Sequence, residues 1–379
     1  METYRIGPIR PPSEAQSLLL QVTRGCTWNK CKFCNLYRHT KFRAYTIDSI
    51  KEDIRRMACF ANKALEKKAP DGTWDLEKLN AELASMTEEE QNCYYTVIMW
   101  LMSGGRTVFL QDGNSLALSG GKLTEVLICL KKTFPQIERI TSYGRAENLS
   151  KVSAEEFAEL KEAGLDRIHC GFESGSDEVL RLVNKGVTAQ QQITAGKNIK
   201  TGGLELSVYF MPGLGGKQLT EENASGMAHV VREAEPDYVR IRTACVKPGT
   251  ELYEDYRKGC FLLCSEKEKV TEIREMIRAA GEGPTRIVSD HIVNLLQGVK
   301  GSLSCDKEKM IGIIDGYLAL PEQQRRLFQL GRRLGGMVSL KELERLSGEQ
   351  RQEFLQILAQ FPQQEAWTEK MNDLAGRYI

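Results

Sequence analysis

The chain has 379 residues, with 52 Lys and Arg against 51 Asp and Glu, so its formal net charge is +1 at pH 7. This length allows one large domain or two modest ones and a sizeable core without disulfide support. The charge balance excludes a global electrostatic attraction to nucleic acid or to an anionic membrane. The longest apolar stretch, residues 93–102, is far shorter than the ~20 residues of a membrane span. The start of the chain has no apolar signal region, so we expect a cytoplasmic protein.

Short β-forming runs recur through the first two thirds of the chain, and each leads through a polar or glycine-rich loop into a helical pattern. The expected strands are Leu18–Val22, Thr107–Leu110, Arg139–Ser142, Arg167–Phe172, Glu205–Phe210 and Tyr238–Arg242. The expected helices are Ile47–Leu65, Leu123–Lys132, Ala154–Ala163, Glu178–Val183, Gln190–Lys200 and Glu221–Glu233. This alternation predicts an α/β fold, with a parallel sheet or barrel of six β/α units.

Two regions depart from this repeat. Residues 69–105 contain the breaker Pro70-Asp71-Gly72 and then Thr87 with Glu90 three residues later, which has the form of a capping box. We expect a helical insertion there. From Pro284 onward the pattern predicts only helices. The expected divisions are an N-terminal arm (1–16), a core (17–250), a connecting helical segment (251–283) and a C-terminal helical domain (284–379).

Three cysteines directly follow the first expected strand. Cys26, Cys31 and Cys34 have the spacing C-x4-C-x2-C, on a loop at the strand end that carries the chemistry in parallel β/α barrels. The chain has 11 cysteines and no secretion signal, which favours metal-binding or catalytic thiols over a disulfide framework. Three clustered thiolates can hold three irons of a 4Fe–4S cluster and leave the fourth iron with an open site.

The segment around these cysteines is basic. No acidic residue lies between Glu14 and Asp48. The cations in this segment are Arg24, Lys30, Lys32, Arg38, Lys41 and Arg43. They would offset the negative thiolates and could attract an anionic substrate group. For each single side chain, a solvated basic loop is the alternative.

With Phe33 before its third cysteine, this loop resembles the signature of the radical SAM superfamily, usually C-x3-C-x2-C; the first gap here is one residue longer. The resemblance covers residues 15–250. It implies a partial TIM barrel of six β/α units and an oxygen-sensitive 4Fe–4S cluster whose unique iron is chelated by S-adenosylmethionine (SAM). It also implies reductive cleavage of SAM to methionine and a 5′-deoxyadenosyl radical that abstracts hydrogen from a small-molecule substrate. An external electron donor such as flavodoxin or ferredoxin is implied, and a nucleic-acid partner is not expected.

The loop after the fourth expected strand resembles one branch of this superfamily in particular. Residues 171–177 read Gly-Phe-Glu-Ser-Gly-Ser-Asp, similar to the G-x-E-S-G-S/T loop of the branch that contains oxygen-independent coproporphyrinogen oxidase, the methylthiotransferases and the Elongator-type enzymes. The resemblance implies that Glu173 binds SAM, through its ribose hydroxyls or its amino group. A structural carboxylate is the alternative.

The loops after the second and third strands are further candidates. Asp112, Gly113 and Asn114 stand where the family usually has a GGE-like segment that binds the methionine amino group. A simple Asp-Gly turn is the alternative. Arg145 is a candidate partner for the SAM carboxylate and a candidate catalytic residue, and Arg145 or Glu147 in a structural ion pair is the alternative.

The loops after the fifth and sixth strands resemble adenine-binding segments. Residues 211–216, Met-Pro-Gly-Leu-Gly-Gly, contain Met211 and Gly213 as candidate cofactor residues, because small residues let the backbone approach a base. A plain flexible turn is the alternative. Arg242 is the candidate in the sixth loop, and its side chain could instead line the substrate cavity.

One histidine is a candidate catalytic residue. Ser289-Asp290-His291-x-x-Asn294 is expected to open the first C-terminal helical segment, with its polar groups within one turn. His291 would then transfer a proton or contact a substrate carboxylate. An N-capped helix with no further role is the alternative.

The remaining cysteines leave other classes of protein open. Cys245, Cys260, Cys264 and Cys305 follow the core, where some radical SAM subfamilies hold auxiliary clusters, and ordinary thiols are the alternative. Cys59, Cys93 and Cys129 are expected in the core of helical segments. A structural zinc module with His39 as fourth ligand is a second class of function. An iron–sulfur electron carrier without SAM chemistry is a third, although it normally needs four cysteine ligands.

Overall fold

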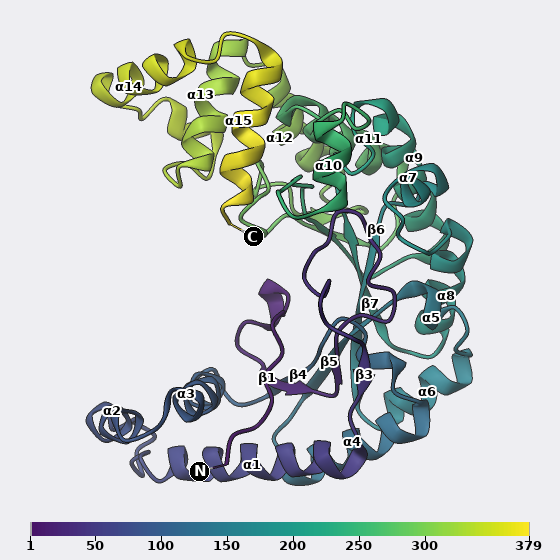
Figure 1. The fold of residues 1–379 in the computed structure, drawn as a ribbon, viewed down its shortest axis with the longest axis vertical. Helices are drawn as coiled ribbons and strands as arrows, with labels where there is room; N and C mark the ends of the chain where they lie inside the picture. Colours follow the sequence, from purple (N-terminus) through teal and green to yellow (C-terminus); the bar gives the residue numbers. More distant parts are fainter. Residues whose placement is uncertain (1, 379) are drawn as a thin grey trace. The chain divides into compact units, whose positions relative to one another are not determined.

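A computed structural model describes residues 2–378 (Figure 1). The chain forms two compact units, each assembled from several segments of the sequence. Unit 1 comprises Met1–Asn29, His39–Cys170 and Asn198–Glu205, and unit 2 comprises Lys30–Arg38, Gly171–Lys197 and Leu206–Ile379. The expected division at residues 17, 251 and 284 stays a prediction.

Unit 1 is built on a parallel sheet in the order β1-β4-β5-β6. The bounds are β1 Leu18–Gln21, β4 Thr107–Gln111, β5 Arg139–Gly144 and β6 Leu165–Glu173, of which the last residues belong to unit 2. All four residues of β1 are buried, as expected of a parallel strand covered on both faces. Two short strands, β2 Thr23–Arg24 and β3 Arg43–Ala44, pair antiparallel beside it.

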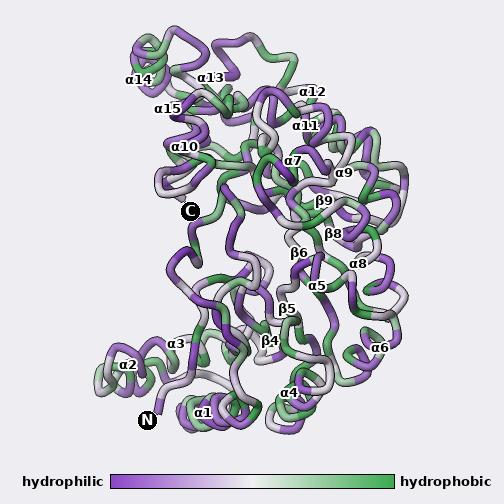
Figure 2. The backbone as a smooth tube through the Cα atoms, turned by 45° about the vertical axis from the view of Figure 1, so that its right-hand side comes forward, coloured by the Kyte–Doolittle hydropathy of each residue, from purple (hydrophilic) through white to green (hydrophobic). Residues whose placement is uncertain are grey.

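The helices of unit 1 pack on this sheet and on one another. Their bounds are α1 Ile47–Leu65, α2 Leu76–Ala84, α3 Glu88–Met102, α4 Gly120–Thr133, α5 Ala146–Leu149 and α6 Ala154–Glu162, with the 3-10 turns η1 Pro12–Glu14 and η2 Ser115–Ala117. Helix α1 buries one stripe that includes Ile50, Ile54 and Met57, the spacing of an amphipathic helix. Figure 2 shows hydrophilic and hydrophobic residues alternating along its turns.

The helical insertion expected at 69–105 is confirmed by α2 and α3. Thr87 caps α3, and its side chain and that of Glu90 form the expected capping box. Helix α3 packs against α1, so the insertion belongs to the core of unit 1. Cys93, on α3, is buried as expected, whereas Cys59 on α1 is exposed and Cys129 on α4 is only partly buried.

Unit 2 contains β7 Glu205–Phe210, whose first residue belongs to unit 1, β8 Tyr238–Ile241, β9 Arg286–Val288 and β10 Gly301–Ser302, in that order in the sheet. Strand β9 lies parallel to β8, and β10 pairs antiparallel with β9. The expectation that no strand follows Pro284 is therefore wrong. Strand β9 has three residues, of which only Ile287 is buried, so it is too short to show a strand pattern in the sequence.

The helices of unit 2 form two packed groups. Their bounds are α7 Asp177–Leu182, α8 Ala189–Thr201, which ends in unit 1, α9 Thr220–Ala234, α10 Glu251–Arg257, α11 Glu266–Ala279, α12 Lys307–Leu318, α13 Glu322–Arg333, α14 Gly348–Ala359 and α15 Gln364–Gly376, with η3 Lys217–Leu219 and η4 Leu340–Leu343. Helix α11 packs between α9 and α12, and α13 packs against α14 and α15 (Figure 1).

The α/β class expected from the sequence is confirmed, since all six expected strands are present and alternate with helices. Strand β7 and helix α1 have the expected bounds. None of the helices in residues 2–378 combines the length and the apolarity that crossing a bilayer requires.

A buried ion pair fixes α13 within unit 2. Arg333 Nη2 lies 2.7 Å from Glu266 Oε1, and the two side chains are 1% and 2% exposed. Arg333 Nη1 also donates to the Val293 carbonyl at 2.7 Å. Burial raises the pKa of Glu266, but the positive charges of Arg333 and Lys269 outweigh it, so this pKa is lowered and the carboxylate is ionised.

The Glu266→Ala variant should lose about 3–5 kcal/mol of unfolding free energy, because Arg333 then stays buried without its carboxylate. Urea unfolding followed by circular dichroism at pH 7 measures this loss. A Glu266→Leu/Arg333→Met double variant removes both charges and should recover most of it. An equal loss in both variants would contradict an origin in the unpaired charge.

Candidate cofactor site

The cysteine loop contains three cysteines. Cys26 belongs to unit 1 and is half-buried, whereas Cys31 and Cys34 belong to unit 2, the former buried and the latter half-buried. The Cys34 N–H donates to the Cys31 carbonyl at 3.2 Å, so these two residues share one turn. Within residues 2–378 no three Cys, His, Asp or Glu side chains are gathered into a metal-binding group. The loop fits a cluster by the spacing and chemistry of its donors.

Asp112 holds the backbone next to Cys26. Its side chain is fully buried, and its Oδ2 accepts from the Gly25 N–H at 3.0 Å and from the Gln21 amide at 3.1 Å. Its Oδ1 accepts from the Gly113 N–H at 2.9 Å. Burial raises the pKa of Asp112, and these hydrogen bonds only partly oppose that rise. Asp112 therefore anchors the start of the cysteine loop; a contact of Asp112 or Gly113 with SAM stays a prediction.

Asn114 connects the cysteine loop with the loop after β5. Its Nδ2 donates to Thr27 Oγ1 at 3.1 Å and to Asn148 Oδ1 at 2.6 Å. Its Oδ1 accepts from the Arg145 N–H at 3.2 Å. The side chain of Asn114 is fully buried, so water does not reach its end of these three contacts. Its role toward SAM stays a prediction.

Arg145 lies beside a predicted cluster ligand. Its Nη1 is 3.9 Å from Cys26 Sγ, and its guanidinium carbon is 5.6 Å from the centre of the Trp28 ring. The positive guanidinium therefore lies beside the sulfur, where it would offset the negative charge of a thiolate-ligated cluster. This placement adds a role that the sequence did not predict, while a contact with the SAM carboxylate stays a prediction.

Glu173 ends β6 in an unusual backbone conformation. Its φ is +66°, which few residues other than glycine adopt. Its carbonyl accepts from the Met211 N–H at 2.8 Å, so the ends of β6 and β7 are joined there. A Cβ at Gly171 would lie 2.3 Å from Glu173 Oε1. Glycine at 171 therefore makes room for the side chain of Glu173.

A lysine that the sequence reasoning missed accompanies Glu173. Lys185 Nζ lies 3.1 Å from Glu173 Oε1, and both side chains are nearly nine-tenths buried, at 12% and 13% exposure. The same Nζ lies 5.5 Å from the centre of the Phe33 ring. Through these two contacts Lys185 links Glu173, in the loop after β6, to Phe33 in the cysteine loop. The signal for Lys185 was its position as the first lysine after the ESGS loop, followed by a glycine.

A buried acid that was also missed holds the predicted adenine loop. Glu272 Oε2 accepts from the Gly213 N–H at 2.8 Å and from Asn223 Nδ2 at 2.7 Å, and Asn223 also donates to the Met211 carbonyl. Gly213 has φ +85°, which favours glycine. Glu272 lies on the buried face of α11 with Ile273, and an acid on such a face was the available signal. Adenine contacts of Met211 and Gly213 stay predictions.

Burial dominates the ionisation of Glu272, which is 1% exposed. It raises the pKa of Glu272 to about 8, despite the hydrogen bonds from Gly213 and Asn223 that oppose the rise. The folded chain therefore keeps a proton on this carboxyl at pH 7, whereas an unfolded chain releases it near the ordinary value of 4.5.

Glu272 should make stability fall with rising pH. Between the two pKa values the folded state binds the extra proton, so unfolding becomes easier by about 1.4 kcal/mol per pH unit until the pH passes the folded value. The Glu272→Gln variant is neutral throughout and should lack this component. Urea unfolding from pH 5.5 to 7.5 measures the difference. The control is Glu275→Gln, on the same helix; identical slopes for wild type and Glu272→Gln would contradict the assignment.

The segment 289–297 is a loop and not the start of a helix, so that expectation is wrong; the next helix, α12, begins at Lys307. Asn294 explains the difference, because its side chain bonds the end of β8. Its Oδ1 accepts from the Thr243 N–H at 2.9 Å, and its Nδ2 donates to the Ile241 carbonyl at 2.7 Å. These partners lie about 50 residues away in the sequence, so local spacing did not reveal them.

His291 lies in this loop and is predominantly neutral at pH 7. Burial, with a smaller effect of the positive charge on Arg242, lowers the pKa of His291 to about 4. Its Nδ1 accepts from the Val293 N–H at 3.3 Å, so in the neutral ring Nε2 carries the proton. His291 can donate a hydrogen bond but does not offer a positive charge at neutral pH. Its catalytic role, and the adenine contact of the exposed Arg242, stay predictions.

Helix α10 braces the part of the cysteine loop in unit 2. The Leu252 N–H donates to the Lys32 carbonyl at 2.9 Å, and Lys32 Nζ lies 2.7 Å from Asp255 Oδ2. Arg38 forms an ion pair with Glu251. Two of the six cations expected to offset the thiolates are therefore paired with acids of α10.

The Asp255→Asn variant should lose iron faster than wild type, because the loop that holds Cys31 and Cys34 loses its ionic contact with α10. Reconstituted protein is exposed to an iron chelator, and iron per chain is followed over time. We expect a several-fold faster loss, as is usual when a supporting contact of a metal ligand is removed. Glu254→Gln, at an exposed position of the same helix, is the matched control. Equal rates for the two variants would contradict the bracing role.

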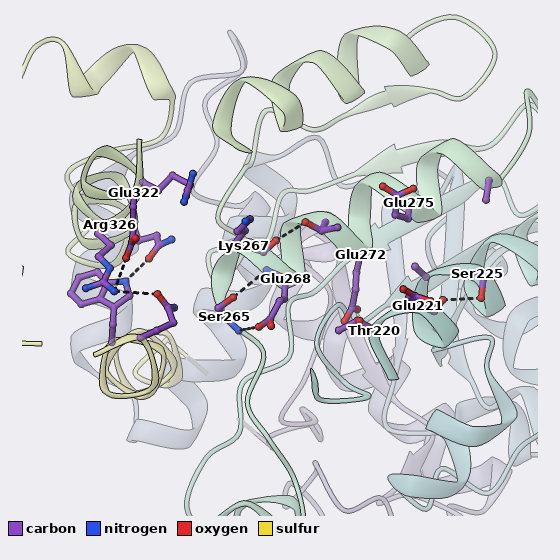
Figure 3. A pocket seen from close by; sticks show the side chains of 17 residues that line it. Thr220, Glu221, Ser225, Ser265, Lys267, Glu268, Glu272, Glu275, Glu322 and Arg326 are labelled. Carbon is purple, nitrogen blue, oxygen red and sulfur yellow. Dashed lines mark hydrogen bonds and ion pairs between the residues drawn. The ribbon is translucent and has the colours of Figure 1, made fainter. Parts of the chain in front are cut away.

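Unit 2 also contains a cavity of about 770 Å³ between α9, α11, α13 and α15. Figure 3 shows Glu268, Glu272, Glu275 and Glu322 among its lining side chains. None of the site residues expected from the sequence lines it. Its connection to the predicted cofactor loops is Glu272, which holds the backbone of Gly213.

Residues 91–224 match the family described as the radical SAM superfamily. The chain contains a radical SAM domain. The matched residues include Asp112, Arg145 and Glu173 but not the cysteine loop. The cofactors of this superfamily are a 4Fe–4S cluster and SAM, and radical chemistry is what they supply.

Several curated proteins are similar to parts of this chain. A tRNA uridine(34) acetyltransferase of Methanocaldococcus infernus is 30% identical over 123 residues, 32% of this chain and 23% of the relative. The heme chaperone HemW of Bacillus subtilis is 24% identical over 47% of this chain and 46% of its own length. A tRNA-2-methylthio-N(6)-dimethylallyladenosine synthase of Chlorobium phaeobacteroides is 23% identical over 74% of this chain and 53% of its own length. The chain spans about a quarter of the length of the first of these relatives.

Solved structures with a similar chain trace include the Elp3 protein of Methanocaldococcus infernus, with a TM-score of 0.44 and 21% identity over 60% of this chain and 58% of that one. Coproporphyrinogen III oxidase (HemN) of Escherichia coli has a TM-score of 0.43 and 17% identity, over 73% of this chain and 52% of that one.

Proposed function

We propose that this protein is a radical SAM enzyme that cleaves SAM reductively and directs the resulting 5′-deoxyadenosyl radical to a hydrogen of its substrate. The observation that carries the proposal is the C-x4-C-x2-C loop after β1, in a chain that contains a radical SAM domain. Cys26, Cys31 and Cys34 would hold the cluster, and its fourth iron would be open to SAM.

Glu173 and Lys185 suit the methionine end of SAM. Their side-chain charges are opposite and lie 3.1 Å apart, and the methionine end carries an amino group and a carboxylate. The lysine can pair with the carboxylate and the glutamate with the amino group, so SAM would replace an internal ion pair with two external ones. The low exposure of both side chains strengthens such contacts, since water screens them little.

The remaining candidate residues would prepare the protein for this chemistry. Arg145 would place its positive charge beside the negatively charged cluster that Cys26 ligates, because its guanidinium lies beside the sulfur. The loop that begins at Met211 would receive the adenine, with Glu272 fixing the backbone at Gly213. His291 would donate a hydrogen bond through Nε2 to the substrate rather than attract it by charge.

We infer a small anionic substrate. The cysteine loop is basic and includes the exposed Lys30, which supplies local attraction, while the balanced net charge of +1 gives no extended attraction to a nucleic-acid backbone. A tRNA substrate is the second candidate, favoured by the names of relatives that act on tRNA. Either substrate leaves the proposed cleavage of SAM unchanged.

Anaerobically reconstituted protein with SAM and dithionite should form 5′-deoxyadenosine, measured by liquid chromatography. The Cys26→Ala/Cys31→Ala/Cys34→Ala variant should form none above background. A matched control replaces the exposed cysteines Cys59, Cys260 and Cys305 by Ala and should keep the activity of wild type. Equal product from the two triple variants would contradict the proposal, as would an inactive wild type that holds about four irons per chain.

A further inference from the structure

The short β2–β3 ladder places two like charges opposite each other. Arg24 on β2 pairs in register with Arg43 on β3, and both are exposed. Like charges at directly opposed positions destabilise a two-stranded ladder. Lys41, just before β3, is also exposed. We call these three residues the hairpin patch.

Among the described residues the hairpin patch has no ion-pair partner, although the positive charge of Arg24 partly opposes the rise that burial causes in the pKa of Asp112. In the part of the chain that the structure describes, neither Arg24, Lys41 nor Arg43 forms an ion pair with a carboxylate. Arg43 instead lies over the Tyr45 ring, 4.9 Å from its centre. By contrast Arg5, over the same ring, is paired with Asp53 at 2.5 Å. The ring positions Arg43 and leaves its charge available to a partner.

The hairpin patch is rigidly joined to a predicted cluster ligand. Gly25 and Cys26 directly follow Arg24, and the buried carboxylate of Asp112 holds the Gly25 N–H. The ladder hydrogen bonds of β2 and β3 fix the other side of the loop. A protein that binds the hairpin patch therefore contacts Arg24, which is only two residues before Cys26 in the sequence.

We propose that the hairpin patch is the docking surface for an acidic one-electron donor protein. The inference rests on the proposed function, which requires one electron for each SAM that is cleaved. The donor is oxidised by one electron, and the cluster is reduced by one. Electrostatic attraction between opposite patches raises the rate of such encounters, and redox partners meet through small, transient interfaces. A compact patch of three cations matches that size.

The same patch is poorly suited to an RNA. Affinity for nucleic acid comes from many phosphate contacts, about 6–10 in a typical binding protein. The hairpin patch has three cations, and the whole chain has a net charge of +1. Acidic carboxylates on a small protein face are therefore the better match for Arg24, Lys41 and Arg43.

Flavodoxin serves as the acidic probe, and its affinity for the full, reconstituted chain is measured by titration calorimetry at low and high salt. Wild-type affinity should fall as salt rises. Arg24→Glu/Arg43→Glu should weaken binding about tenfold or more. The control, Lys122→Glu/Lys132→Glu, makes the same change of charge at exposed positions of α4 and should bind like wild type. Thermal melting confirms that both variants are folded.

Two further measurements distinguish a failure of the docking proposal from a failure of the proposed function. Product formation with dithionite needs no docking surface and therefore tests the proposed function separately; no product from wild type would contradict the proposed function and not the docking proposal. Equal flavodoxin affinity for wild type and Arg24→Glu/Arg43→Glu would overturn the docking proposal. The docking proposal would also be overturned if Arg24→Glu/Arg43→Glu lost tRNA binding but kept flavodoxin binding. That result would mean that the hairpin patch binds RNA.

Discussion

A buried carboxylate that accepts backbone N–H groups is the interaction on which the predicted cofactor loops depend. Asp112 is fully buried, and its two oxygens accept from Gly25, Gln21 and Gly113. Removing a carboxylate from water is costly unless such donors satisfy it. The loop before Cys26 can therefore not shift without breaking several contacts at once. Fixed backbone near a predicted metal ligand is what a preorganised site requires.

Unit 2 also holds a loop backbone with a buried acid. Glu272 accepts from the Gly213 N–H and from Asn223, but burial raises its pKa to about 8 and leaves it protonated at pH 7. A neutral acid avoids the cost of a buried charge while it still accepts through one oxygen. Glu173 is stabilised in a third way, because the positive charge of Lys185 lies beside its carboxylate. Each solution holds one loop at a strand end.

The sequence predicted long, strongly patterned elements well. Helix α1 and strand β7 have the expected bounds, since their burial follows local periodicity. The sequence failed where long-range contacts decide the structure. Asn294 bonds the end of β8, so the expected helix around His291 does not form. The roles of Lys185 and Glu272 likewise depend on partners that lie 12 and 59 residues away, and no local spacing identifies such pairs.

The central claim is that Cys26, Cys31 and Cys34 hold a 4Fe–4S cluster whose fourth iron is open to SAM. Electron paramagnetic resonance of the reduced, reconstituted protein, recorded with and without SAM, tests it most directly. We expect about four irons per chain and a cluster signal whose g-values change when SAM is added, because SAM becomes a ligand. A cluster signal that SAM leaves unchanged, or a folded protein with one zinc and no iron, would contradict the claim.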